Sequence, residues 1–148
     1  MKAALGSALL GAAGLLAPAL AGATAPQVEV FVAPHQVERI TGQEALERAW
    51  PGVHIVIFDL GAPQRFEDRL SAGLPDDSAQ AQRLLEERIR AEDLEAQVLD
   101  AFAGILRAAR LGLDRLPAVV FDDRAIVYGV TDLTQATGQY RGWADAQP

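Results

Sequence analysis

The sequence predicts an α/β domain in which a strand–helix–strand unit is followed by helices, an antiparallel β-hairpin and a C-terminal helix. Three observations predict it. Residues 118–121 and 126–128 are β-prone and are separated by a short polar connection, which is typical of a hairpin. Residues 53–58 form a nearly continuous apolar run, as in a strand that is covered on both faces. Between residues 94 and 110, apolar side chains recur at helical spacing.

The first 23 residues have the pattern of a secretory signal peptide. A charged start is followed by an apolar stretch over residues 3–17 and then by small residues that suit cleavage after Ala21 or Ala23. A membrane anchor needs about 20 unbroken apolar residues, whereas glycines and a proline interrupt this stretch. We therefore expect export to the periplasm, with residues 24–148 as a single domain that makes no stable membrane insertion after cleavage.

Composition limits the partners and the chemistry. The 20 acidic residues outnumber the 13 basic ones, and the resulting net charge of −7 disfavours contact with nucleic acid and anionic lipid. The chain has no cysteine, which excludes dithiol exchange, a thiolate nucleophile and cysteine-bound metal. We expect no direct nucleic-acid binding and no cofactor.

The first strand is predicted over residues 27–33, and Pro34 ends it. Thr41 and Glu44 have the spacing of a capping box, with Thr41 as the N-cap of a helix that ends near residue 50. A proline and a glycine then lead to the second strand at residues 53–58. These elements form the strand–helix–strand unit.

The region from residue 66 to residue 112 is too long for one crossover helix. We expect a short helix near residues 67–72, then helices at 79–90 and 94–110, either separate or continuous. The last of these carries a clean apolar stripe made of Leu94, Val98, Phe102, Ile105, Leu106 and Ala109. The mixed charges of residues 83–93 are interpreted as a solvated face.

The hairpin is followed by a final amphipathic helix. Thr131 or Asp132 can serve as its N-cap, and apolar residues recur at helical spacing from Leu133 onward. Asp122 and Asp123 in the hairpin turn resemble paired carboxylates, but turn carboxylates usually make local hydrogen bonds. We expect that structural role here.

This order of elements, with Leu116-Pro117 directly before the hairpin, resembles a thioredoxin fold. Thioredoxin-like proteins place a cis proline at this position facing the active-site loop, so the resemblance favours a cis Leu116–Pro117 bond, whereas base rates favour trans. In that topology residues 53–58 lie at the sheet edge. An apolar edge needs further structure to cover it or a partner strand to pair with it.

The chain also resembles a family of exported proteins of unassigned function that bacterial integrating conjugative elements encode. The resemblance rests on residues 30–32 with Pro34, the helical segment 101–104, and residues 111–113, 116–120, 127–129 and 132–133. It implies a cysteine-free, thioredoxin-like protein associated with conjugative type IV secretion, the machinery of DNA transfer. The implied partners are other exported proteins of that machinery.

Where redox relatives carry cysteines after the first strand, this chain has residues 33–39. His35 with Glu38 could transfer protons there, but no third group that would orient them is apparent. The two histidines, His35 and His54, also lack a spaced carboxylate pattern for a metal site. We therefore predict no catalytic residue and no metal.

The resulting hypothesis is a non-catalytic module that acts through protein–protein interaction. Its predicted interaction surface is Pro34, His35, Leu116 and Pro117, where redox relatives dock extended polypeptide. The alternatives are a cysteine-free enzyme or small-ligand binder that uses the same groove, and a periplasmic chaperone for exported subunits.

Overall fold

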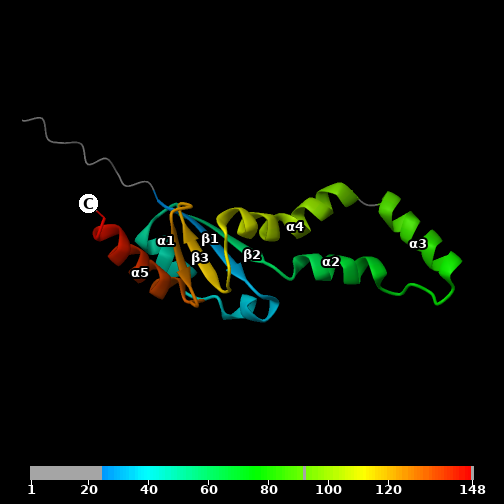
Figure 1. The fold of residues 1–148 in the computed structure, drawn as a ribbon, viewed down its shortest axis with the longest axis horizontal. Helices are drawn as coiled ribbons and strands as arrows, with labels where there is room; N and C mark the ends of the chain where they lie inside the picture. The colour runs from blue at the N-terminus through cyan, green and yellow to red at the C-terminus, as the bar shows by residue number, and fades with distance from the viewer. Residues whose placement is uncertain (1–24, 92, 148) are drawn as a thin grey trace, which may run out of the picture.

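The computed structural model describes residues 25–91 and 93–147, in which a four-stranded sheet is combined with six helices (Figure 1). The strands are β1 (Gln27–Val32), β2 (His54–Asp59), β3 (Ala118–Phe121) and β4 (Ala125–Tyr128). Their order in the sheet is β2-β1-β3-β4, with β1 and β2 parallel and the other neighbours antiparallel. The predicted α/β class and hairpin are confirmed. The predicted signal peptide lies outside the described residues.

The predicted helices occur in the predicted order, and the structure adds a 3-10 helix after β1 that was not predicted. The helices are the 3-10 helix η1 (Pro34–Arg39), α1 (Gln43–Ala49), α2 (Ala62–Ser71), α3 (Ser78–Ala91), α4 (Leu94–Leu111) and α5 (Leu133–Asp145). The structure gives α3 and α4 as two separate helices. No helix of the described part is both long and apolar enough to cross a membrane.

The sheet has a hydrophobic cluster on each face. On one face, alternate residues of β1 and β3 pack with Leu46 of α1 and with Leu133 and Ala136 of α5. On the other face, Phe31 packs with Ala108 of α4. Because successive strand residues point to opposite faces, the central strands β1 and β3 are buried on both sides.

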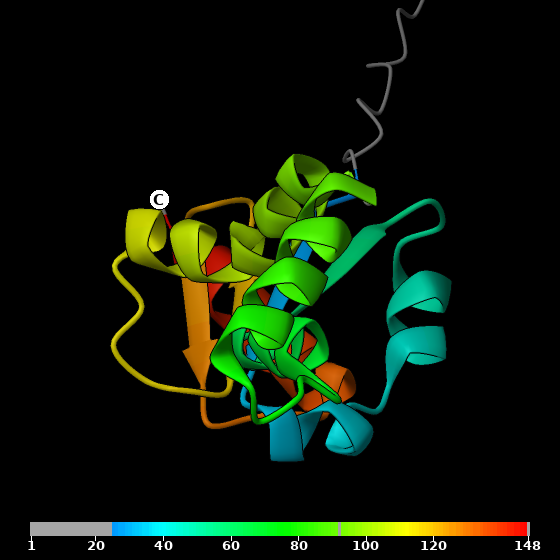
Figure 2. The ribbon, with the colours of Figure 1, turned by 90° about the vertical axis from the view of Figure 1, so that its right-hand side faces the viewer.

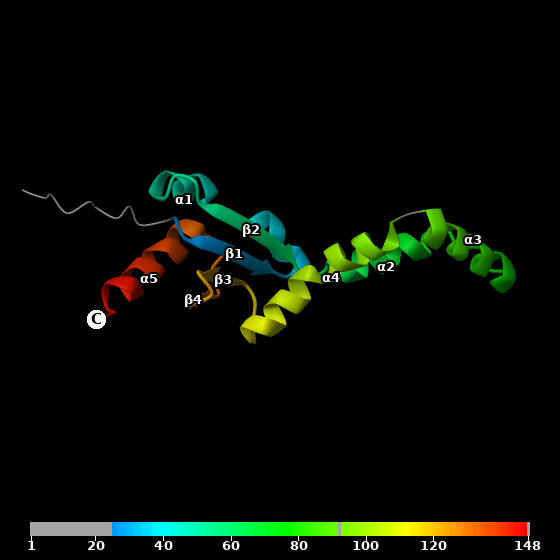
Figure 3. The ribbon, with the colours of Figure 1, turned by 90° about the horizontal axis from the view of Figure 1, so that it is seen from above.

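Part of the molecule extends away from this sheet. In Figures 1 and 3, α2, α3 and the N-terminal half of α4 form an arm that extends past the strands, with α3 at its tip. Figure 2 looks along the arm and shows its helices in front of the sheet. Within the arm, Arg88 Nη1 joins α3 to α2 by donating to the carbonyl of Leu70 at 2.6 Å. None of residues 78–90 is buried.

The predicted capping role of Thr41 is wrong. Gly42, at φ 82°, occupies the N-cap position of α1 and provides no side-chain cap. Thr41 instead joins the start of α1 to the start of α5. Its N–H donates to the carbonyl of Thr131 at 3.1 Å, and its carbonyl accepts from Leu133 N at 2.8 Å. Asp132 is the N-cap of α5, as one of the two predictions had it.

Helix α4 packs inward mainly through small residues rather than through its apolar stripe. Its buried residues are Ala101, Gly104 and Ala108, all of them small. A Cβ atom at Gly104 would lie 3.0 Å from both Phe58 Cβ and Leu60 Cδ2, so the absence of a side chain permits this close approach. Small residues let the helix lie against β2 and α2, and the larger apolar side chains are left on the outer surface: Val98, Leu99, Ile105 and Leu106 are exposed.

Strand β2 lies at the sheet edge, and the expected cover of both its faces is only partial, although Ile55 packs against the cluster that contains Leu46 and Leu133. His54 and Ile57 are exposed, and the other residues of β2 are partly buried. The α4 helix covers one face through Phe58 and Leu60. No other strand of the described residues pairs with the outer side of β2.

Candidate interaction site

The sheet register brings the predicted surface residues to one end of the sheet. Phe31 of β1 lies opposite Ala118 of β3. One residue further along each strand, Pro117 is therefore next to Val32, where β1 ends and η1 begins. The four predicted residues come from two segments about 80 positions apart in the chain, but both segments lie at this end of the sheet.

The segment after β1 is held by its own side chains and by the β2–α2 turn. The side chain of Gln36 accepts from Ala33 N at 2.9 Å, which caps the start of η1. Pro34 lies against Gly61, where an added Cβ would be only 2.2 Å from Pro34 Cγ. Pro34 and His35 are exposed, so this corner presents a proline ring and an imidazole to solvent.

The segment before β3 is more deeply placed. The Leu116–Pro117 peptide bond is cis, as the thioredoxin resemblance favoured. Pro117 is buried, and its carbonyl accepts from Gly129 N at 2.9 Å. Leu116 is partly buried against the cluster that contains Phe31 and Ala108. The exposed part of the predicted surface is thus Pro34 and His35, with Leu116 as its apolar margin.

The two histidines are far apart. His54 pairs with Gln27 at the beginning of β1, whereas His35 follows the end of that strand. The steps from Gln27 to Val32 alone span about 16 Å at about 3.3 Å per residue, and His35 lies three residues beyond Val32. The described residues contain no group of three or more metal-ligating side chains, and the His35 ring has no hydrogen-bond partner there.

A charged contact between β1 and α4 was not predicted from the sequence. Glu29, in the middle of β1, is 4% exposed and faces α4. Arg107 binds it through two nitrogens, with Nε 2.9 Å from Oε1 and Nη2 2.7 Å from Oε2. Arg107 also binds Asp123 of the hairpin turn. The hydrogen bond and charge of Glu29 raise the pKa of Arg107 above its ordinary value, against the opposing effect of burial. The sequence signal that could have indicated this contact is the position of Glu29 inside an apolar strand.

Asp122 connects the hairpin turn to more distant parts of the chain. Its Oδ1 accepts from Gln27 N at 2.9 Å, and its Oδ2 accepts from the Tyr140 hydroxyl at 3.3 Å. The expected local hydrogen bonding of Asp122 and Asp123 is therefore wrong, since their partners lie on β1, α4 and α5. Burial, and to a lesser degree Asp122, raises the pKa of Tyr140.

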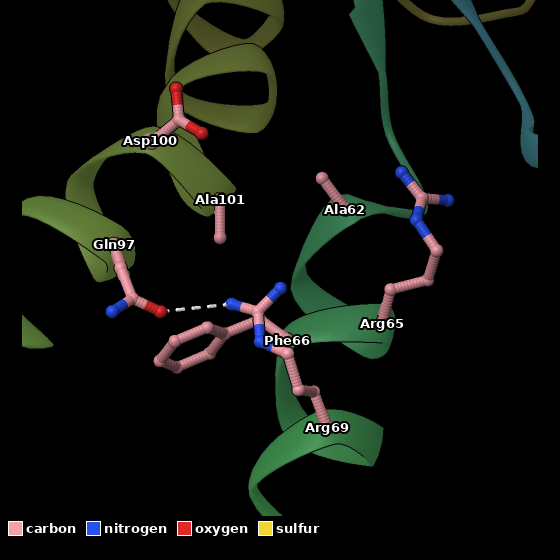
Figure 4. A pocket seen from close by; sticks show the side chains of 7 residues that line it. All are labelled: Ala62, Arg65, Phe66, Arg69, Gln97, Asp100 and Ala101. Atoms are coloured by element: carbon pink, nitrogen blue, oxygen red, sulfur yellow. Dashed lines mark hydrogen bonds between the residues drawn. The ribbon is translucent and has the colours of Figure 1, made fainter. Parts of the chain in front are cut away.

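A pocket of about 210 Å³ lies in the arm rather than at the predicted surface (Figure 4). It lies between α2 and α4, and Arg65, Arg69, Gln97 and Asp100 are its polar lining. Both arginines already have partners. Arg69 donates to Gln97 at 3.0 Å, and Arg65 pairs with Asp59 at 2.7 Å. These contacts tie the arm to itself and to the end of β2, which is a structural role.

The chain matches the model of a protein family. The model of a family described as a protein of unknown function (DUF1525) matches residues 28–146, which include the whole sheet except its first residue. No curated protein and no solved structure matches the chain.

Proposed function

We propose that this chain, which belongs to the DUF1525 family of proteins of unknown function, is a non-catalytic interaction module of a conjugative type IV secretion apparatus. In this proposal the apparatus is encoded by an integrating conjugative element, and a signal peptide over residues 1–23 delivers the module to the periplasm. Its scaffold is thioredoxin-like. The strand order β2-β1-β3-β4 and the terminal hairpin support that scaffold.

The observation that carries the proposal is the meeting of two strand ends at one surface. Pro34 and His35 follow β1, and Leu116 and Pro117 precede β3, so the sheet register brings both segments to the same end of the sheet. The surface combines exposed apolar and imidazole groups with a partly buried leucine. Such a surface suits an extended polypeptide, the ligand that redox relatives dock there. The absence of cysteine removes redox chemistry from it.

The test is site-specific crosslinking in cells that carry the conjugative element. A photoreactive residue in place of His35 should yield crosslinks to exported components of the secretion apparatus. His54 provides the matched control, because it is also an exposed histidine on this sheet but lies at the opposite end of β1 and β2. Equal crosslinking from both positions would argue against this surface. Recovery of no secretion component from either position would contradict the proposed function.

The enzyme and ligand-binder alternatives have their own test. His35 is the acid–base group of this surface, and in the 3-10 helix it shares a side with Glu38, three residues on. His35→Ala should leave the transfer frequency unchanged if the module is non-catalytic. A large loss of transfer with normal folding would instead favour catalysis. Transient rather than stable crosslinked complexes with pilus or secretion subunits would favour the chaperone.

A further inference from the structure

The outer surface of α4 is apolar along most of its length. Leu99 is 60% exposed and Leu106 is 49% exposed, and Val98 and Ile105 are exposed beside them. Phe102 and Ala103 lie between these residues and are partly buried. Seen from above in Figure 3, α4 lies in front of α2, and no other described helix or strand covers it. We call this surface, residues 95–110 on the outer side of α4, the α4 stripe.

Six residues along the middle of the α4 stripe have the same spacing in both directions. Starting from Glu95, they follow at intervals of four, three, one, three and four positions, through Leu99, Phe102, Ala103 and Leu106 to Arg110. Intervals of three and four keep side chains on one side of a helix. The midpoint lies between positions 102 and 103, so Leu99 and Leu106 are equally far from it, as are Glu95 and Arg110.

The two ends of the stripe carry opposite charges. Glu95 lies in the first turn of α4 and Arg110 in its last turn, about 22 Å apart at 1.5 Å per residue. Both side chains are exposed, and neither has an ion-pair or hydrogen-bond partner among the described residues. Their charges remain available to a partner.

We propose that the α4 stripe is the contact of a symmetric homodimer, in which α4 of a second copy lies antiparallel on α4 of the first. A two-fold axis through the midpoint places Leu99 against Leu106 of the second copy and Glu95 against its Arg110. The axis repeats both contacts, so each of the two, the Leu99–Leu106 contact and the Glu95–Arg110 ion pair, occurs twice in the dimer. Intervals of three and four residues suit helix packing of this kind.

The charges select the antiparallel direction. In a parallel pair, Glu95 would meet Glu95 of the second copy and Arg110 would meet Arg110, and both contacts would be repulsive. Shallow hollows on the surface continue the stripe at both ends. One of about 530 Å³ is lined by Ile89, Leu94, Val98 and Leu99 with Asp93 and Glu95, and one of about 330 Å³ is lined by Phe58, Leu99, Ala103 and Leu106 with Arg107 and Arg110. The acidic end and the basic end therefore each offer room for the opposite end of a second copy.

The test is the mass of the purified protein, produced from the full chain and processed by the cell, in sedimentation measurements over a concentration series. The wild-type protein should form dimers. Glu95→Arg and Arg110→Glu should each weaken association roughly tenfold in Kd, because two ion pairs become two repulsive contacts. A 1:1 mixture of these two variants, and the double variant, should both regain the wild-type Kd. A structural role of either residue within the monomer gives no such rescue.

A second measurement fixes the location of the contact. Because the chain has no cysteine, Ala103→Cys introduces a single thiol beside the proposed axis, which should form an intermolecular disulfide on mild oxidation. Ala79→Cys, at an exposed position of α3, is the matched control and should give no disulfide-linked dimer under the same oxidation. A wild-type protein that stays monomeric, failure of the mixed variants to associate, or equal crosslinking of both cysteine variants would each overturn the dimer. None of these readouts depends on conjugation or on the surface at His35.

Discussion

At the scale of single residues, the ion pair between Glu29 and Arg107 is the most consequential contact. It joins the central strand to α4, and the bond from Arg107 to Asp123 extends it to the hairpin turn. A buried pair of this kind gives little net stability over a well-packed apolar pair, but loss of one partner leaves an unpaired charge. The Glu29–Arg107 ion pair instead fixes how α4 crosses the sheet.

Arg107→Met should therefore lower the free energy of unfolding by about 3 kcal/mol, because the carboxylate of Glu29 stays buried without its partner. The double variant Glu29→Met with Arg107→Met should recover most of that loss. Urea unfolding followed by circular dichroism measures both. Arg83→Met, at an exposed position of α3, is the control and should change stability by less than about 0.5 kcal/mol. A double variant that is no more stable than the single one would contradict this account.

The raised pKa of Tyr140 predicts that the protein loses stability at alkaline pH. The pKa of Tyr140 is raised in the folded protein, chiefly by burial, so the folded state retains its proton at a pH where the unfolded state loses it. The contribution is complete below the ordinary tyrosine pKa of 10.0 and falls as pH rises above it. The free energy of unfolding of the wild-type protein should decline between about pH 9 and pH 11, the range around that pKa. The free energy of unfolding of the Tyr140→Phe variant should decline less over the same range. Lys2 is the only lysine, so few other groups titrate there.

At the scale of elements, two glycines in helices have opposite roles. Gly104 of α4 lies against Phe58 and Leu60, whereas nothing lies within 4 Å of an added Cβ at Gly142 of α5. Gly142→Ala should raise the free energy of unfolding by about 0.5–1 kcal/mol through helix propensity. Gly104→Ala should lower it by about 1 kcal/mol, because crowding against β2 exceeds that gain. Thermal unfolding compares the two directly, and stabilisation by both would show that α4 can move away from β2.

Much of the element order could be predicted from the sequence because its signals are local. Pro34 ends β1, Gly112 ends α4 with φ 66°, and Asp132 caps α5 through Thr134 N at 2.8 Å. The orientation of α4 could not be predicted in this way. An apolar stripe on a helix predicts that this face is buried. In α4, however, Gly104 and its small neighbours pack inward, and several larger apolar side chains stay exposed.

The candidate site was predictable to a similar degree. The end of β1 and the start of β3 were placed to within one residue from their prolines, and the register brings Pro34 and Pro117 to one end of the sheet. The Glu29–Arg107 pair was not predicted, because 78 positions separate its members and only the packing of α4 on β1 brings them together. Long-range polar contacts of Asp122 were missed for the same reason.

At the scale of the whole molecule, the sheet and the arm differ in how firmly they are held. Residues of β1 and β3 are nearly all buried, whereas α3 has no buried residue between positions 78 and 90. Elements with few buried contacts open locally at low free-energy cost. The tip of the arm should therefore be the least protected helix of the described part.

Limited trypsin digestion measures this difference. The first cleavages should follow Arg83, Arg88 or Arg90 in α3, because local opening there needs no disruption of the sheet. Arg107 should resist cleavage for longer, since it is tied to Glu29. Mass spectrometry of early fragments identifies the sites, and an initial cut after Arg107 would contradict the predicted order of opening.

Helix α4 belongs to both parts of the molecule, because its C-terminal half packs on the sheet and its N-terminal half forms one side of the arm. The number of residues between Arg107 and Leu94 therefore sets the direction in which α3 points. Each residue added to or removed from that stretch would turn the tip by about 100° around the helix axis and shift it by about 1.5 Å. Insertions or deletions in this stretch would therefore preserve the direction of α3 only if they added or removed close to a whole number of helical turns.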